Sequence, residues 1–377
     1  MIEAIWHEYQ SRRDFFKACA TLTLLSFTIG KGQEPGYVEP EEARYYKKFG
    51  GKVKCQLCPH TCTVSEGRRG ICRVRVNRGG RYYTLAYGNP CAVHLDPIEK
   101  KPLFHFLPGT SALSIATAGC NFSCKYCQNW RISQFAPEET LNLRTKPEEI
   151  VAEAIRRKES HKSYTIAYTY TEPSIFYEFM LDTAKIARKR GIKNIYHSNG
   201  FLNEKPLEEL CDYLDGANID LKSYREEFYN EICGGELQPV LNTLKTLRKR
   251  KIHLEITNLV IPTLNDKDEE IQDLCRWIRD NLGSDVPVHF SRFYPMFKLT
   301  QLPPTPIKTL ERVVKIAQDE GLKFVYMGNV PNNKFEDTYC PKCGRILINR
   351  MGYQILKNNI NKGRCNYCGE LISGVWK

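Results

Sequence analysis

The sequence lacks any internal repeat of fixed period and any low-complexity tract, which excludes solenoid and collagen-like architectures. Its uncharged stretch at residues 18–30 is too short to span a bilayer as a helix, and no second candidate follows. Because 42% of the residues are hydrophobic and 26% are charged, the composition is typical of a folded globular protein rather than a disordered one.

Acidic residues are in deficit, since 43 Asp and Glu face 55 Lys and Arg, which gives a net charge of +12. The bases are spread along the chain and form no uninterrupted block. We therefore expect a solvated basic surface, and the sequence carries no strong nucleic-acid signal.

Cysteine, in contrast, is abundant. Eleven of the sixteen cysteines stand in three clusters with recurring two-residue gaps, a spacing that favours thiolate metal ligands over a disulfide framework. The clusters are Cys55, Cys58, Cys62 and Cys72; Cys120, Cys124 and Cys127; and Cys340, Cys343, Cys365 and Cys368. The isolated Cys19, Cys91, Cys211, Cys233 and Cys275 are expected to be small buried hydrophobes.

The amino-terminal segment resembles a twin-arginine export signal. Residues 11–17 read Ser-Arg-Arg-Asp-Phe-Phe-Lys and precede the uncharged stretch, although no A-x-A cleavage site follows. An amphipathic leader without export function is the alternative. We expect residues 1–45 to form a leader and linker outside the fold.

From residue 111 onward, short β-branched or aromatic runs alternate with amphipathic stretches, which predicts a parallel sheet covered by helices. Strands are expected at 112–117, 164–169, 193–197, 217–221, 252–260, 286–291 and 323–327. Helices are expected at 147–159, 174–190, 205–214, 236–250, 268–282 and 306–320. Six or seven such units predict an α/β fold with a partial (β/α)6-type TIM barrel over 109–332. A cysteine-rich segment at 46–108 precedes it and a zinc-ribbon-like tail at 333–377 follows.

The central motif is C-x3-C-x2-C, formed by Cys120, Cys124 and Cys127 directly after the first barrel strand. Three thiolates on a [4Fe-4S] cluster leave one iron open, and an open iron can chelate a small molecule. Active sites of β/α barrels lie at this carboxyl edge. A zinc site, or a cluster closed by a fourth cysteine from elsewhere, are the alternatives.

This loop resembles the signature of radical S-adenosylmethionine (SAM) enzymes. The resemblance implies that a reduced cluster cleaves SAM to a 5′-deoxyadenosyl radical, which is oxidoreductase chemistry, and that Tyr126 lies beside the cofactor. It further implies SAM contacts for Glu172, within Tyr-Thr-Glu-Pro after the second strand, and for Ser198 and Asn199, within His-Ser-Asn-Gly after the third. Asp-Leu-Lys at 220–222, at the end of the fourth strand, is similar to the Asp-Leu-Lys of glycyl-radical activating enzymes. The alternative to a role in the site is a purely structural pair of Asp220 with Lys222.

A closer resemblance, to the AmmeMemoRadiSam system radical SAM enzymes, covers about residues 50–377. It rests on residues 55–62, 70–72, 96–105 and 127–130, which read Cys-Gln-Leu-Cys-Pro-His-Thr-Cys, Gly-Ile-Cys, Asp-Pro-Ile-Glu-Lys-Lys-Pro-Leu-Phe-His and Cys-Gln-Asn-Trp. These enzymes are relatives of the activases of glycyl-radical enzymes. A protein substrate and an electron donor such as ferredoxin or flavodoxin are therefore expected. The need for SAM indicates a cytoplasmic enzyme, whereas the leader indicates export.

Two other functions stay open on the sequence alone. An exported Fe–S electron carrier without SAM chemistry would explain the leader. A nucleic-acid-binding protein, or a tRNA-modifying radical enzyme, would explain the charge and the tail.

The two outer cysteine clusters have different spacings. Two C-x2-C-Gly knuckles at Cys340, Cys343, Cys365 and Cys368 predict a structural zinc site, with an Fe–S cluster or a redox dithiol pair as alternatives. Cys55, Cys58, Cys62 and Cys72 are less regularly spaced, with His60 as a spare ligand, and fit zinc or an auxiliary [4Fe-4S] cluster equally well.

Overall fold

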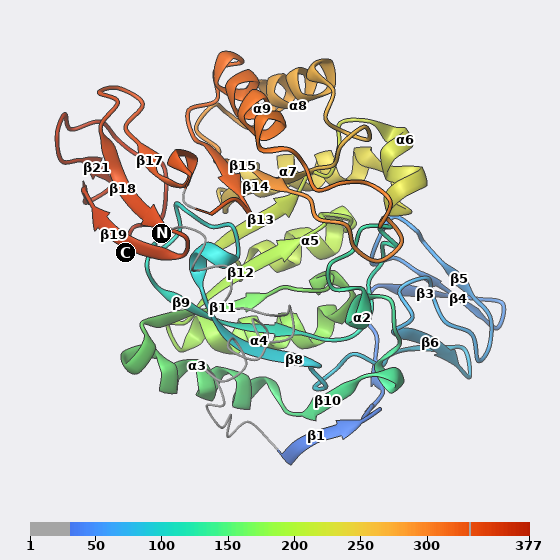
Figure 1. Ribbon diagram of the computed structural model, residues 1–377. Coiled ribbons are helices and arrows are strands. Elements are labelled where there is room, and N and C mark those ends of the chain that lie inside the picture. Colours follow the sequence, from blue (N-terminus) through green and yellow to red (C-terminus); the bar gives the residue numbers. More distant parts are fainter. Residues whose placement is uncertain (1–30, 332) are drawn as a thin grey trace, which may run out of the picture.

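The computed structural model describes residues 31–331 and 333–377 and is built on one eight-stranded sheet (Figure 1). The strand order is β16-β15-β14-β13-β12-β11-β9-β8. Neighbours from β9 to β16 are parallel, and β8 pairs with β9 in the antiparallel sense. The strands are β8 (Ala92–Pro97), β9 (Ser111–Ala116), β11 (Ser163–Tyr168), β12 (Lys193–Ser198), β13 (Gly216–Asp220), β14 (His253–Val260), β15 (Val288–Arg292) and β16 (Val325–Gly328). Because β9 to β16 run parallel to one another, their carboxyl ends meet at one edge of the sheet.

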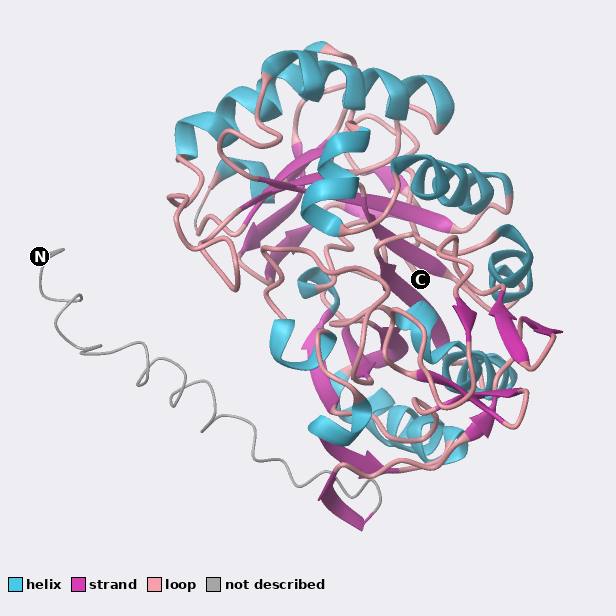
Figure 2. Ribbon diagram, turned by 90° about the vertical axis from the view of Figure 1, so that its right-hand side faces the viewer, coloured by secondary structure: helices cyan, strands magenta, loops and turns pink. Residues whose placement is uncertain are grey.

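A helix follows each parallel strand except the last, as Figure 2 shows by the cyan helices surrounding the magenta strands. They are α3 (Pro147–His161), α4 (Tyr177–Lys189), α5 (Glu204–Cys211), α7 (Leu237–Lys249), α8 (Asp268–Asn281) and α9 (Ile307–Asp319). Shorter turns are η1 (Ile98–Lys100), α2 (Trp130–Ser133), η2 (Pro137–Glu139), η3 (Pro173–Phe176), α6 (Glu226–Phe228), η4 (Tyr229–Cys233) and η5 (Lys334–Glu336). Each predicted strand and helix is present within a few residues of its expected bounds, and the α/β class is confirmed.

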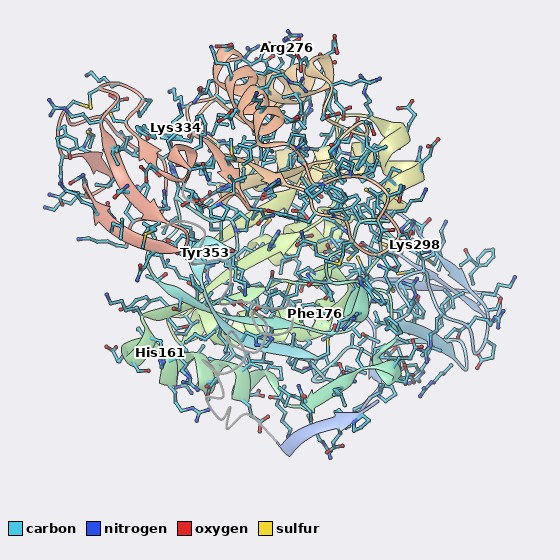
Figure 3. The ribbon with its side chains drawn as sticks, viewed as in Figure 1. His161, Phe176, Arg276, Lys298, Lys334 and Tyr353 are labelled. Carbon is cyan, nitrogen blue, oxygen red and sulfur yellow. The ribbon has the colours of Figure 1, made fainter. Side chains whose placement is uncertain are left out.

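The core lies between the sheet and these helices. Strand residues such as Ile166, Ile195, Ile256 and Phe290 are fully buried, as expected of a parallel sheet whose faces are both covered. Figure 3 shows Phe176 in the interior and Arg276 at the outer edge. Within the described residues, no helix is long and apolar enough to cross a membrane.

The segment before the barrel forms small antiparallel sheets. Their strands are β2 (Glu41–Glu42), β3 (Tyr46–Phe49), β4 (Lys52–Cys55), β5 (Thr63–Val64), β6 (Arg75–Arg78) and β7 (Arg81–Thr84). In addition, β1 (Lys31–Pro35) pairs with β10 (Leu141–Arg144). The expectation that residues up to 45 lie outside the fold is therefore wrong for residues 31–45, because strand pairing across the chain fixes them. The twin-arginine-like residues 11–17 and Cys19 lie outside the described residues.

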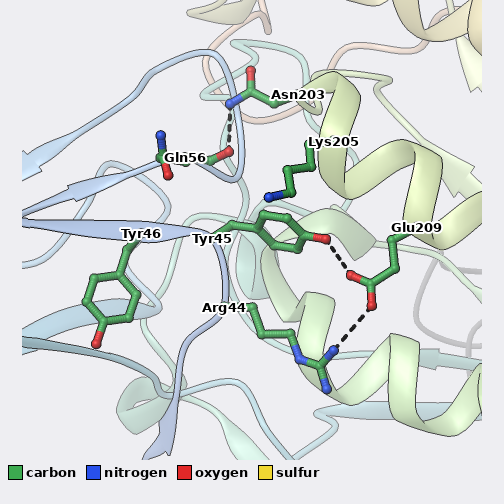
Figure 4. Close-up of a pocket in the computed structure, with 7 residues that line it drawn as sticks. All are labelled: Arg44, Tyr45, Tyr46, Gln56, Asn203, Lys205 and Glu209. Carbon is green, nitrogen blue, oxygen red and sulfur yellow. Dashed lines mark hydrogen bonds and ion pairs between the residues drawn. The ribbon is translucent and has the colours of Figure 1, made fainter.

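Side-chain contacts dock the same segment onto α5. In Figure 4, Arg44 and Tyr45 both point to Glu209, and the Arg44 guanidinium lies 3.4 Å from its carboxylate. Asn203, just before α5, donates a hydrogen bond of 2.8 Å to the backbone carbonyl of Gln56. The strip between Cys55 and Cys58 is thus held against the barrel.

The tail folds into short strands and packs on the opposite side of the sheet from the amino-terminal segment (Figure 1). The strands are β17 (Thr338–Tyr339), β18 (Ile346–Met351), β19 (Gln354–Asn358), β20 (Ile360–Asn361) and β21 (Arg364–Cys365). Leu347 and Ile348 share a hydrophobic cluster with Phe104 and Tyr326 of the barrel. The Arg350 guanidinium donates to the Phe104 carbonyl at 2.9 Å, so the tail is anchored by packing and by hydrogen bonds.

Candidate active site at the carboxyl edge of the sheet

The loop after β9 carries Cys120, Cys124 and Cys127, which are free thiols. Gly119 begins the loop with a φ of +98°, and a Cβ there would lie 2.7 Å from the carbonyl oxygen of Cys72. Only glycine fits such a close approach. The backbone therefore brings the predicted cluster loop against the first cysteine cluster.

Hydrogen bonds to sulfur shape the loop. The Phe122 amide donates to Cys120 Sγ at 3.3 Å, and Cys127 Sγ lies 3.1 Å from the hydroxyl of Ser133 on α2. Burial raises the pKa of both thiols, most strongly that of Cys120. A bound metal centre would favour the thiolate form of both groups.

Cys233 is a site residue that sequence reasoning missed. It ends η4 and is fully buried, as expected of the isolated cysteines, but it is not merely a hydrophobe. Its thiol lies 3.6 Å from the Tyr126 hydroxyl, and its interaction with Cys124, together with burial, raises the pKa of Cys124 well above its ordinary value. The backbone amide of Ser123 donates to the Cys233 carbonyl at 2.8 Å.

One sequence signal could have found this contact. A Cβ on Gly234, which follows Cys233, would lie 2.5 Å from the Ser123 hydroxyl, and one on Gly235 would clash with Phe122. A Gly-Gly pair after a cysteine is typical of close backbone approach.

Glu172 organises the ends of β11 and β12. One carboxylate oxygen accepts hydrogen bonds from Ser198 Oγ (2.8 Å), the Ser174 amide (3.0 Å) and the Tyr196 hydroxyl (3.3 Å), and the other accepts from the Asn199 amide (2.8 Å). Glu172 is 1% exposed, and burial raises its pKa despite these donors. The predicted SAM contact of Glu172 stays a prediction.

Asn199 continues this network to the cysteine loop. Its side-chain amide donates to Asn121 Oδ1 at 2.8 Å, and Asn121 in turn donates to the Phe201 carbonyl at 2.9 Å. The structure thus brings Glu172, Ser198 and Asn199 together beside Cys120, three segments that are far apart in sequence.

Asp220 and Lys222 form an ion pair of 2.9 Å after β13, and His197 lies 3.3 Å from the same carboxylate. Although burial opposes ionisation, Lys222 holds the pKa of Asp220 below its usual range. The Lys222 ammonium also lies 5.9 Å from the centre of the Tyr126 ring. The pair is therefore structural and also borders the predicted cofactor position.

The first cysteine cluster adjoins this site. Cys55, Cys58, Cys62 and Cys72 line one cavity, and Asn121, Ser174 and Ile175 of the barrel form its other wall. The predicted spare ligand His60 is already engaged, because its Nε2 lies 2.8 Å from the Asn121 carbonyl oxygen.

The last cysteine cluster lies apart, in the tail. Within the described residues it is the one group of Cys, His, Asp or Glu whose ligand atoms all lie within 4.8 Å of one another. Sγ of Cys340 is 3.6 Å from that of Cys368, and Sγ of Cys343 is 3.8 Å from that of Cys365. This arrangement can hold a metal ion.

Comparisons with known proteins agree with the site. The model of the radical SAM superfamily matches residues 114–277, which include the three-cysteine loop, Glu172 and Cys233. The uncharacterized protein MJ0808 of Methanocaldococcus jannaschii is 47% identical over 337 residues, 89% of this chain and 99% of that protein. The chain belongs to the radical SAM superfamily.

Other radical SAM proteins are more distant. The pyruvate formate-lyase 1-activating enzyme of Escherichia coli K12 is 22% identical over 227 residues, 55% of this chain and 89% of that enzyme. The crystal structure of a radical SAM methyltransferase from Sphaerobacter thermophilus has a TM-score of 0.48 and 13% identity, and the match covers 89% of this chain and 86% of that one.

Radical SAM membership carries iron–sulfur dependence and SAM cleavage with it, as general properties of the superfamily. It leaves the alternative of an Fe–S electron carrier without SAM chemistry unsupported.

Proposed function

We propose that this protein is a radical SAM enzyme that binds a [4Fe-4S] cluster through Cys120, Cys124 and Cys127 and generates a 5′-deoxyadenosyl radical for hydrogen abstraction. The observation that carries the proposal is the joining of the three-cysteine loop to the ends of β11 and β12 through Glu172 and Asn199. When bound, the cluster supplies the electron for reductive cleavage of SAM.

The thiols present fit such a cluster. Three cysteines on one loop, of which Cys124 is buried and the other two are partly buried, leave a fourth position free, which suits chelation of SAM rather than a closed electron-transfer centre. Cys233 contacts Tyr126 at 3.6 Å and influences the pKa of Cys124. We assign Cys233 as a neighbour of the cluster loop, not as a fourth ligand.

The remaining residues would position SAM. Tyr126 is 5% exposed and is fixed by Cys233 and by Phe228, whose ring centre lies 6.1 Å away. Ser198 and Asn199 stand where the loop after β12 meets the cysteine loop. Glu172 fixes both through its carboxylate.

The fold supports the finer description as a partial (β/α)6-type TIM barrel. Seven parallel strands in sequential order, with β8 and β16 at the two edges in the described residues, suit an open barrel with a lateral entrance. We divide the described chain into a cysteine-rich segment at 31–108, the radical SAM core at 109–332 and the tail at 333–377, since β1 pairs with β10 and β2 pairs with β7.

The substrate class follows from the relatives. Similarity to pyruvate formate-lyase activating enzymes favours a glycyl-radical activase-like reaction on a partner protein, driven by ferredoxin or flavodoxin. A protein segment could enter through the open side of the barrel.

The tail would hold zinc. Zn–S bonds of about 2.3 Å in a tetrahedron place sulfur atoms about 3.8 Å apart, close to the 3.6 and 3.8 Å found. Zinc bound by the four thiolates would then stabilise a module whose apolar core is small.

Electron paramagnetic resonance (EPR) spectroscopy of the anaerobically reconstituted, dithionite-reduced protein tests the proposal. We expect a [4Fe-4S]⁺ signal that SAM shifts, together with formation of 5′-deoxyadenosine. The shifted signal should vanish in Cys124→Ala and persist in Cys275→Ala, which removes a buried thiol from α8. The proposal would be refuted if SAM left the EPR signal of the reduced protein unchanged and no 5′-deoxyadenosine formed.

A further inference from the structure

We propose that Cys55, Cys58, Cys62 and Cys72 hold a second iron–sulfur cluster of the four-iron type, not zinc, and that it passes electrons to the cluster on Cys120, Cys124 and Cys127. The relay rests on the proposed function, whereas the metal assignment does not.

The spacing of the thiols separates the two metals. Four sulfur atoms around one zinc lie about 3.8 Å apart, and the tail cysteines meet this condition. In the described part of the chain neither the first cluster nor the three-cysteine loop has three ligand atoms all within 4.8 Å. Like the three-cysteine loop, the first cluster is thus not drawn together around one ion, and ligands at the corners of a four-iron cube lie farther apart than those of one zinc.

The four thiols nevertheless face one cavity. Gly70 forms part of its wall, where a Cβ would lie 3.6 Å from Cys62 Sγ and 2.9 Å from the Tyr82 hydroxyl. Four thiols converging on one cavity are a ligand set for a metal centre.

Arg75 provides an independent sign of a ligand. It lines the same cavity and is fully buried, and its Nη2 contacts both carboxylate oxygens of Glu178 at 2.7 Å. Its Nε–H is buried without a hydrogen-bond partner. An unpaired buried donor costs about 1–3 kcal/mol, and a cluster sulfur would accept this hydrogen bond. Donors to sulfur tune the potential of iron–sulfur clusters.

The cavity touches the active-site loop. The Cys72 carbonyl packs on Gly119, the residue before Cys120. His60, within the first motif, meets the carbonyl of Asn121, the residue after Cys120. One layer of residues therefore separates the two cysteine clusters, a short path for an electron.

The surface around the cavity suits an acidic electron carrier. Residues 46–81 contain ten Lys and Arg against one Glu. Three of these bases, Arg69, Arg75 and Arg81, pair with acids from other segments, and the others are available to a partner. Lys47, Lys54, Arg68 and Arg78 are exposed, and Ile71, which lines the cavity, is 54% exposed.

The electron balance is simple. A low-potential acidic one-electron carrier protein, of the flavodoxin or ferredoxin class, is oxidised by one electron. The first cluster takes up that electron and is reoxidised when it reduces the cluster at the active site.

The metal assignment is tested in the full chain with Cys120, Cys124 and Cys127 all replaced by alanine. We expect about four irons and four sulfides per chain to remain, with a reduced [4Fe-4S]⁺ EPR signal that SAM does not alter. Adding Cys58→Ser should remove the iron. A chain without iron that carries about two zinc ions would overturn the assignment. If the triple variant does not fold, the iron content of the wild-type protein is measured instead. About eight iron atoms per chain would support the proposal, and about four would refute it.

The relay is tested by comparing rates of 5′-deoxyadenosine formation with reduced flavodoxin and with dithionite. In Cys58→Ser the ratio of the two rates should fall at least about tenfold, since the protein carrier loses its entry point. Cys275→Ala is the matched control. An unchanged ratio in a variant that has lost the first cluster would overturn the relay and leave both the metal assignment and the proposed function standing.

Discussion

The carboxylate of Glu172 accepts the backbone amide of Asn199 at 2.8 Å and so ties the end of β11 to the loop after β12. The same carboxylate accepts three further hydrogen bonds, all from buried groups. We therefore predict that Glu172 is a positioning residue whose effect on SAM binding passes through Ser198 and Asn199.

Glu172→Gln leaves only one acceptor oxygen for these donors. Each buried donor left unpaired costs about 1–3 kcal/mol, so we expect lower stability and about tenfold more SAM for a half-maximal shift of the EPR signal. Glu255→Gln is the control, because Glu255 is also buried and accepts four hydrogen bonds, from His253, His289 and two backbone amides. It lies in the amino-terminal half of β14, so its substitution should lower stability alone. Equal SAM requirements in the two variants would contradict the positioning role.

Cys233→Ala tests the contact of the Cys233 thiol with Tyr126 and Cys124. The thiol lies 3.6 Å from the Tyr126 hydroxyl, so losing this polar neighbour of the cluster loop should shift the EPR spectrum of the cluster and slow SAM cleavage by about tenfold. Cys233→Ser keeps a polar group at this position and should restore much of the rate. Cys275→Ala, an equally buried thiol on α8, should change neither quantity. A normal spectrum and rate in Cys233→Ala would assign Cys233 to packing alone.

The sequence predicted the elements that local periodicity encodes. The expected strand at 112–117 and helix at 147–159 correspond to β9 and α3, because a short apolar run encodes a buried strand and a helical repeat of apolar residues encodes an amphipathic helix. The spacing of Cys120, Cys124 and Cys127 likewise carries its own signal. Ser198 and Asn199 were found through resemblance, not periodicity.

Contacts between distant segments left no local signal. The pairing of Cys233 with Cys124, the packing of Cys72 on Gly119 and the strand pair of β1 with β10 each join residues far apart in the chain. Their partners depend on the topology of the sheet, which composition and spacing do not encode. The glycines at such contacts, where any side chain would collide with the distant segment, are the one sign of these contacts that the sequence carries.

Cys368→Ser should remove about one metal ion per chain from the tail. Because the apolar core of this module is small, with Leu347, Ile348 and Ile372 packed on Phe104, Phe324 and Tyr326, we expect several kcal/mol of local stability to be lost and trypsin to cleave within residues 333–377. Zinc analysis and limited proteolysis measure both effects. Asn366→Ser, an exposed knuckle position, is the control. A resistant tail with unchanged zinc would exclude these thiols as its metal ligands.

Glu99 gives a pH dependence of stability. Burial raises its pKa from the ordinary 4.5 to about 6, and although one oxygen accepts the Gly109 amide at 2.7 Å, the other is buried without a partner. Because the folded pKa is raised, the stabilisation is complete below the unfolded pKa and is lost as the pH rises through about 6. At pH 8 the carboxylate should cost about 2 kcal/mol.

Glu99→Gln keeps an acceptor for Gly109 and removes the charge. Relative to the wild type, the variant should therefore gain about 2 kcal/mol of unfolding free energy between pH 4.5 and pH 8, measured by denaturant unfolding of the metal-loaded protein. Glu311→Gln, on the exposed face of α9, should show no such gain. A difference between wild type and Glu99→Gln that does not vary with pH would mean that Glu99 is already neutral, or already paired, throughout this range, and that its buried oxygen does not set the acid dependence of the fold.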